Sequence, residues 1–200
     1  MNYLAHAYLS FNHPSILVGN MVSDFVKGRK KFEYSEDIQK GISLHRAIDE
    51  FTDFHRVTAF AKSFFRRDYG LYSGPFIDIV YDHFLANDES EFPKGSLLEF
   101  TEKTYAILNS QFSALPLKFQ YLFPFMKTQN WLYNYRHRWG IRNSFEGLVR
   151  RAAYMYESET AFRIFETTYM QLENCFAEFF PAWKEFARLY FDKLVIGGIP

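Results

Sequence analysis

The chain has 200 residues, 48% of them apolar and 20% aromatic, so it can bury the core of one globular domain and is too apolar to be disordered. Its 23 Lys and Arg balance its 23 Asp and Glu, which excludes a global field that attracts nucleic acid, and a charged partner must be recognised by a local patch. The single Cys175 excludes an internal disulfide and a four-thiolate zinc site, and favours a reducing, cytoplasmic setting.

The first 23 residues lack Lys, Arg, Asp and Glu, but they resemble neither a signal peptide nor a membrane span. The stretch has no basic start, and Asn, His, Pro and Gly interrupt its apolar run. We therefore expect a protein that does not cross a membrane.

Turn-forming residues divide the chain into helical segments of ordinary length. Pro14 suits the first turn of a helix that runs to Gly28, Ser35 can cap the next helix, and Pro181 predicts a kink or break. The first two expected helices span about 2–10 and 14–28, and a third begins at about 35. A break at 69–75 separates a fourth helix from a fifth. Further helices are expected at about 94–112, 116–128 and 130–139, followed by two longer ones between 141 and 194. We predict a single all-α domain over residues 1–200.

Ionisable side chains interrupt these helices at positions where the apolar pattern requires core. The segment 75–86 is apolar around almost its whole circumference, which indicates a buried helix, but it carries Asp78, Asp82 and His83. Asp78 and Asp82 are four residues apart and so lie on one face. Because an unpaired buried carboxylate is costly, cations, donors or a metal must lie beside them.

The same spacing of four recurs in three earlier segments. The pairs are Asn2 and His6, Asn20 and Asp24, and His45 and Asp49. If the four surfaces converge, they form a pocket lined by His6, Asp24, His45, Asp49, Asp78, Asp82 and His83. Imidazole and carboxylate ligands without thiolates suit Mn²⁺, Fe²⁺, Zn²⁺ or Mg²⁺. A metal of this kind activates water and orients a phosphate oxygen, so the pattern favours hydrolysis.

Structural explanations compete with a metal site at several of these positions. A lone His such as His6 on an apolar face is more often a hydrogen-bonded core residue, and Asp49 could pair with Arg46 or Arg56. Signatures of other classes are missing from the sequence: there is no Glu-x-x-His pair, no His-Glu-x-x-His, no glycine-rich phosphate loop and no Gly-x-Ser-x-Gly.

The residues with this spacing resemble the acyl carrier protein phosphodiesterases. The resemblance rests on Asn2-Tyr3-Leu4-Ala5-His6, on Gly19-Asn20 with Asp24-Phe25-Val26-Lys27-Gly28, on Gly41-Ile42, His45-Arg46, Ile48-Asp49 and Thr52-Asp53, on Asp78 with Asp82-His83-Phe84-Leu85, and on the weaker Trp131-Leu132 with Tyr135-Arg136. Order and spacing fit from residue 1 to about 192. The resemblance implies a distorted helical fold distantly related to the HD-domain metal-dependent phosphohydrolases.

The resemblance also implies a divalent cation, most often Mn²⁺, and hydrolysis of the bond between 4′-phosphopantetheine and a serine of acyl carrier protein. The positions expected to hold the metal are His6, Asp24, His45, Asp49, Asp82 and His83, chiefly Asp24, Asp82 and His83. The catalytic positions are Asp24, His45, Asp78 and Arg46, of which Arg46 would neutralise phosphate charge. Tyr3 replaces the usual Phe, a change expected to be harmless. Arg56 stands where Pro is common, and much of the C-terminal half departs from the family pattern, so the resemblance supports the phosphodiester chemistry more strongly than the carrier substrate.

An acidic carrier protein needs a basic surface on an otherwise neutral enzyme. Two groups qualify: Lys27, Arg29, Lys30 and Lys31, and a later group of Arg136, Arg138, Arg142, Arg150 and Arg151. Two other functions remain open. One is a phosphohydrolase that acts on a nucleotide or another small phosphate ester, and the other is a helical interaction protein whose Asp and His form structural ion pairs.

Overall fold

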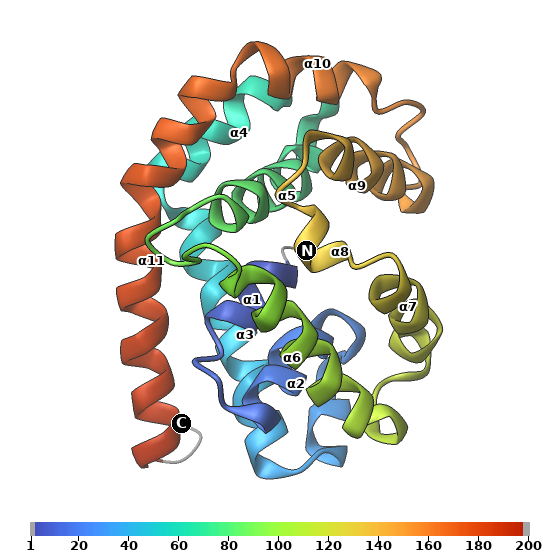
Figure 1. Ribbon diagram of the computed structural model, residues 1–200, viewed down its shortest axis with the longest axis vertical. Helices are drawn as coiled ribbons and strands as arrows, with labels where there is room; N and C mark the ends of the chain where they lie inside the picture. The colour runs from blue at the N-terminus through green and yellow to red at the C-terminus, as the bar shows by residue number, and fades with distance from the viewer. Residues whose placement is uncertain (1–2, 198–200) are drawn as a thin grey trace.

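The computed structural model describes residues 3–197, and every regular element within that range is a helix, which confirms the all-α class (Figure 1). The α-helices are α1 (Tyr3–Tyr8), α2 (Pro14–Val22), α3 (Glu36–Phe54), α4 (Arg56–Tyr69), α5 (Ser73–Ala86), α6 (Ser96–Ser110), α7 (Leu117–Thr128), α8 (Trp131–Asn134), α9 (Arg138–Arg151), α10 (Glu159–Thr167) and α11 (Tyr169–Gly197). Short 3-10 helices lie at Ser23–Phe25, Gly28–Glu33, Gly70–Tyr72 and Phe112–Ala114. Asn2 lies outside the described residues, and the HD-domain relation stays a prediction.

The helices form two groups that share α11 as a common side. α11 runs along one side of the molecule and packs against α3, α4 and α5 (Figure 1). α4, α5, α9 and α10 lie toward one end, and α1, α2, α3 and α6 lie toward the other. The core is rich in large rings, and Tyr81, Phe179 and Trp183 are among its fully buried side chains. Between residues 3 and 197, no helix has the length and apolar character needed to span a membrane.

α2 and α3 approach each other closely at two glycines. A Cβ atom at Gly19 would lie 2.0 Å from the carbonyl oxygen of Ile38, and one at Gly41 would lie 2.2 Å from that of Ile16. Real Cβ atoms do not approach oxygen so closely, so only glycine allows the two backbones to touch here. This contact fixes α3 against α2, and both helices carry predicted site residues.

The second predicted helix ends at Val22 rather than at Gly28, so the expected boundary is wrong. Ser23–Phe25 tightens into a 3-10 turn, and Val26 is extended. Tertiary contacts replace the helical ones here. The Arg46 guanidinium donates to the Val26 carbonyl at 3.0 Å, and the Phe25 ring packs on Phe119. The early end of α2 gives Asp24 a position that a continuous helix would not provide.

The last third of the chain also differs from the expectation of two long helices. It contains α9, α10 and α11, and α11 continues through Pro181, so a break there is wrong, and a kink stays a prediction. Buried side chains on both sides of the proline, including Phe179, Phe180 and Trp183, hold α11 to the core. Their burial outweighs the hydrogen bond that proline removes from the helix.

Candidate metal centre

Two histidines and an aspartate from α1 and α3 meet at one point. The His6 and His45 rings stack, with centroids 3.9 Å apart and planes inclined by 17°. Nε2 of His6 lies 3.2 Å from Asp49 Oδ1, and Nε2 of His45 lies 3.1 Å from Asp49 Oδ2. One donor atom of each residue lies within 4.8 Å of the others. A single carboxylate therefore faces the same edge of two parallel imidazoles.

Asp24 adds a second carboxylate to this cluster. Its Oδ1 lies 3.2 Å from Nε2 of His45. The imidazoles of His6 and His45 are 3% and 5% exposed, whereas the side chains of Asp24 and Asp49 are 41% and 47% exposed. The cluster thus has buried nitrogen donors and carboxylates that face solvent, so an ion or a substrate can reach it from the carboxylate side.

The backbone of α2 sets the orientation of His45. Its Nδ1 lies 2.7 Å from the carbonyl oxygen of Asn20, which can only accept, so Nδ1 carries the proton and Nε2 faces the two carboxylates. Burial lowers the pKa of His45, but the contacts with Asp24 and Asp49 outweigh it and raise that pKa to about 9. Without a metal, His45 is a cation held between two anions.

His6 provides the other buried ring and lacks any aligned hydrogen bond at its nitrogens. Both ring nitrogens are buried and unpaired, although Nε2 lies close to Asp49. Burial and the neighbouring His45 lower the pKa of His6, which favours the neutral ring. A neutral imidazole with a buried, unsatisfied nitrogen beside a carboxylate is the form that ligates a metal.

The side chain of Asn20 joins α1 to α2 beneath the histidines. Its Nδ2 donates to the His6 carbonyl oxygen at 2.9 Å and to Ser10 Oγ at 3.1 Å, and Ser10 Oγ donates to the same carbonyl at 2.7 Å. The sequence marks Asn20 only as a polar neighbour of Asp24. The sequence could not predict that the Asn20 carbonyl contacts His45, because every residue type has a backbone carbonyl.

Asp82 has partners that explain its burial without a metal. Its carboxylate accepts hydrogen bonds from the backbone N–H groups of Leu4 at 3.1 Å and Ala5 at 2.9 Å, and so caps the first turn of α1. Burial raises its pKa, and these two bonds lower it only in part. Asp78 is half-buried one turn earlier on α5, and neither Asp78 nor Asp82 belongs to the described cluster.

His83 also lies apart from the cluster, at the contact of α5 with α8 and α11. Its Nδ1 donates to the Tyr135 carbonyl at 2.7 Å, and its Nε2 lies 3.0 Å from the Tyr169 hydroxyl. Within residues 3–197, the structure thus brings together His6, Asp24, His45 and Asp49 and leaves His83 with other partners. Metal ligation by Asp82 or His83 stays a prediction.

The donor set fits a divalent cation. Two imidazole nitrogens and carboxylate oxygens, with no sulfur, suit Mn²⁺, Mg²⁺, Fe²⁺ or Zn²⁺. Because nitrogen and oxygen ligands lie at about 2.0–2.2 Å from such ions, donors within 4.8 Å of one another can surround one ion after small side-chain shifts. The buried, unpaired nitrogens of His6 support this fit.

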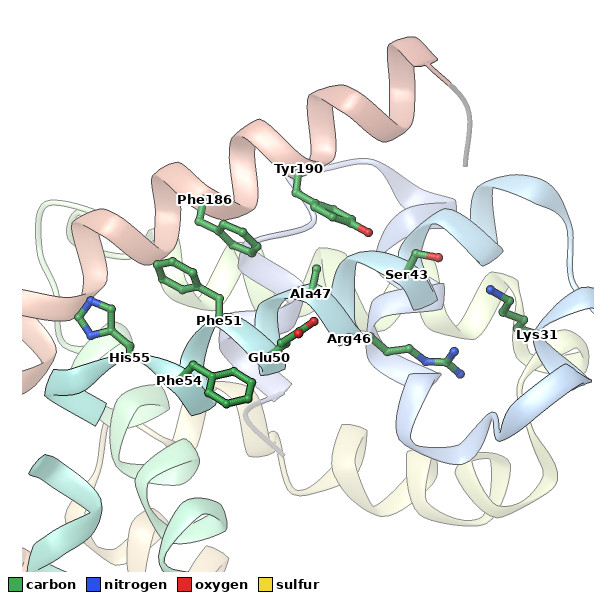
Figure 2. A pocket seen from close by; sticks show the side chains of 10 residues that line it. All are labelled: Lys31, Ser43, Arg46, Ala47, Glu50, Phe51, Phe54, His55, Phe186 and Tyr190. Carbon is green, nitrogen blue, oxygen red and sulfur yellow. The ribbon is translucent and has the colours of Figure 1, made fainter. Parts of the chain in front are cut away.

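A cleft of about 650 Å³ lies between α3 and α11, on the other side of α3 (Figure 2). Phe51 from α3 and Phe186 from α11 stack in it, with ring centroids 4.4 Å apart. Ser43, Ala47 and Phe54 line it and occupy the face of α3 opposite His45, as helical spacing requires. The helix itself therefore separates this cleft from the metal cluster.

Comparisons with known proteins identify the family to which the chain belongs. The family model described as acyl carrier protein phosphodiesterase matches residues 1–183. The chain is 33% identical over 186 residues to the acyl carrier protein phosphodiesterase of Photorhabdus laumondii, covering 92% of this chain and 94% of that one. It is 32% identical over 183 residues to the Yersinia enterocolitica enzyme of the same name, covering 91% and 95%. No solved structure matches significantly. The chain therefore belongs to the acyl carrier protein phosphodiesterase family, a family of hydrolases.

Proposed function

We propose that this protein hydrolyses the phosphodiester that joins 4′-phosphopantetheine to a serine of holo-acyl carrier protein, and uses a divalent cation held by His6, His45 and Asp49 with Asp24. The products are apo-carrier protein and free 4′-phosphopantetheine. The observation that carries the metal dependence is the stacked, buried imidazole pair whose Nε2 atoms both face one carboxylate. The names of the relatives supply the substrate class. Mn²⁺ is the expected ion.

The residues around the cluster divide the chemistry among them. His6, His45, Asp49 and Asp24 would hold a divalent cation, which would supply Lewis-acid polarisation of a phosphate oxygen and activation of water. His45 gives up its Nε2 proton on binding, which makes affinity rise with pH. Asp24, half exposed at the rim, would accept the proton of the attacking water. Asp78, on α5 outside the cluster, stays a predicted catalytic position. The phosphorus–serine oxygen bond breaks, and the serine oxygen takes up a proton.

Arg46 is the residue that we propose to neutralise phosphate charge. It follows His45 on α3, is exposed, and donates to the Val26 carbonyl at 3.0 Å, two residues beyond Asp24. This hydrogen bond ties the guanidinium to the segment that follows Asp24, and the side chain also lines the cleft of Figure 2. Arginine matches phosphate geometry with a rigid fork of donors, so a contact with the phosphate would strengthen as charge develops there.

The basic segment of residues 27–31 is the proposed docking surface for the acidic carrier. Lys27, Arg29 and Lys30 are exposed, and none of them pairs with a carboxylate of residues 3–197. In the later arginine group, by contrast, three side chains have acidic partners: Arg138 pairs with Glu166, Arg142 with Glu159, and Arg150 with Glu146. Unpaired charge close to Asp24 favours the first group.

The test follows the mass of holo-acyl carrier protein incubated with the purified protein and Mn²⁺. Wild type should release the phosphopantetheine group, and Asp49→Asn should lose both this activity and stabilisation by Mn²⁺. Asp53→Asn is the matched control, because Asp53 lies one turn further along α3 and pairs with Lys62 at 2.6 Å. It should retain both properties.

Two results would replace the proposal. An intact carrier despite bound Mn²⁺, with release of phosphate from nucleotides or other small esters, would indicate a small-ester phosphohydrolase. An intact carrier with no Mn²⁺ binding would indicate that His6, His45, Asp24 and Asp49 form a structural ion-pair cluster in a helical interaction protein.

A further inference from the structure

A cleft of about 580 Å³ lies where α8 and α9 meet α5 and the start of α1. This volume is within the range of ~300–1,000 Å³ that is usual for small-molecule sites. Tyr3, Trp131 and Trp139 supply aromatic surface, and Asn134 and Asn143 supply amide groups. The lining therefore suits a ligand that alternates apolar units with amides.

The charged side chains of this cleft are Glu146, Arg150 and Arg151. Arg150 pairs with Glu146, whereas Arg151 has no carboxylate partner within the described chain. A cleft beside α11, in contrast, is lined by several carboxylates, among them Glu91, Glu173 and Glu185, and would repel a phosphate. The cleft in Figure 2 lies behind α3, away from His45. Of these three clefts, the α8–α9 cleft is the one that a residue of α1, Tyr3, lines together with an arginine.

A short path of contacts connects this cleft to the metal cluster. Tyr3 lines the cleft one turn before His6 on α1. Its ring lies 6.4 Å from Phe119, and Phe119 lies 5.4 Å from Phe25, the neighbour of Asp24. One phenylalanine therefore supports both the wall of the cleft and the turn that holds Asp24.

The charges of Arg151 and Asp24 both influence the Tyr3 phenol. Burial raises the pKa of Tyr3, the charge of Arg151 lowers it, and the charge of Asp24 raises it. The phenol thus lies within reach of both charges. Arg151 and Tyr3 line the same cleft, and Tyr3 lies one turn before His6, so a ligand phosphate bound on this side of the cleft would meet Arg151.

We propose that the α8–α9 cleft receives the pantetheine arm of the substrate, with Arg151 pairing the phosphate at the end of the arm. This inference rests on the proposed function and adds a binding site to it. The arm carries two amides, which match Asn134 and Asn143, and a branched apolar segment, which matches the faces of Trp131 and Trp139. Asn143 is exposed and makes no side-chain hydrogen bond with residues 3–197, so its amide is available.

The test measures the affinity of free 4′-phosphopantetheine by calorimetry, together with KM and kcat on holo-carrier protein. Trp139→Ala and Arg151→Gln should each weaken binding about tenfold, the effect of losing one buried ring contact or one charged contact. Phe54→Ala, at the mouth of the cleft in Figure 2, and Arg56→Gln, on a side chain 87% exposed and paired with Glu178, are matched controls and should stay within about twofold.

The two losses should differ in kind. Inorganic phosphate should bind more weakly to Arg151→Gln and with unchanged affinity to Trp139→Ala, because of these two side chains Arg151 alone contacts the phosphate. Equal affinity of wild type and both variants for 4′-phosphopantetheine would overturn the cleft assignment even if holo-carrier is hydrolysed, and so would a loss confined to Phe54→Ala. Binding that follows the prediction without hydrolysis would uphold the cleft and reject the proposed reaction.

Discussion

Replacement of Gly41 by alanine tests whether the contact between α2 and α3 assembles the metal cluster. The new Cβ would lie 2.2 Å from the Ile16 carbonyl oxygen and 2.9 Å from both Asn20 N and Gly19 Cα. All three atoms belong to the backbone, so no side chain can rotate away. To restore even a 3.0 Å contact, the helices must separate by about 0.8 Å. Overpacking of this kind costs about 1–3 kcal/mol.

The separation should damage the site as well as the fold. α3 carries His45 and Asp49, whereas α2 provides the Asn20 carbonyl that orients His45 at 2.7 Å. A displacement of nearly 1 Å breaks this alignment and moves His45 from Asp24. Misplacement on this scale reduces turnover by up to about 10²-fold. We therefore expect Gly41→Ala to lower stability, Mn²⁺ affinity and activity together.

Calorimetric melting and Mn²⁺ titration measure these effects. A loss of 1–3 kcal/mol lowers Tm by about 2–12 °C in a domain of this size. Gly74→Ala is the matched control, because its Cβ would meet only the flexible end of Lys62, at 3.5 Å, and it lies within α5. The control should stay within about 1 kcal/mol of wild type, because Gly74 lies in the first turn of α5 and directly precedes Pro75, where an added Cβ brings little helix propensity. If Gly41→Ala melts like wild type and binds Mn²⁺ equally well, the close contact does not position the site.

Three further outcomes follow from the structure. Asp82→Ala should cost about 1–3 kcal/mol in urea unfolding, because two buried α1 amides lose their acceptor, whereas Asp82→Asn should cost less; equal losses would argue against capping. Arg29→Glu combined with Lys30→Glu should raise KM for holo-carrier, reduce its salt dependence and spare kcat, and an unchanged KM would exclude this docking surface. Burial lowers the pKa of His83 below 6.5, so the unfolded chain takes up that proton first and stability falls as the pH drops below about 6.5. His83→Asn, whose amide can still donate to the Tyr135 carbonyl, should unfold with a shallower stability loss between pH 7 and 5, and identical slopes would refute this.

The sequence alone was sufficient to identify the helical class, the family and the residues that interrupt its apolar faces. Helical periodicity depends only on residues close together in the chain. The same is true of the spacing of four that puts His45 and Asp49 on one face of α3, where His45 Nε2 lies 3.1 Å from Asp49 Oδ2. Buried ionisable groups are also visible in a sequence, because an apolar surrounding predicts their burial. These signals placed His6, Asp24, His45 and Asp49 in one candidate site before any contact between helices was known.

Only the tertiary structure decided which buried groups meet. Asp82 reads as a ligand from its surroundings, yet it caps a helix 78 residues away, and His83 contacts a hydroxyl 86 residues away. The end of α2 at Val22 likewise depends on Arg46 from another helix. Such partners are backbone amides, carbonyls and side chains far along the chain, which no local pattern specifies. Burial shows that a polar group needs a partner, whereas the packing of helices determines which partner it has.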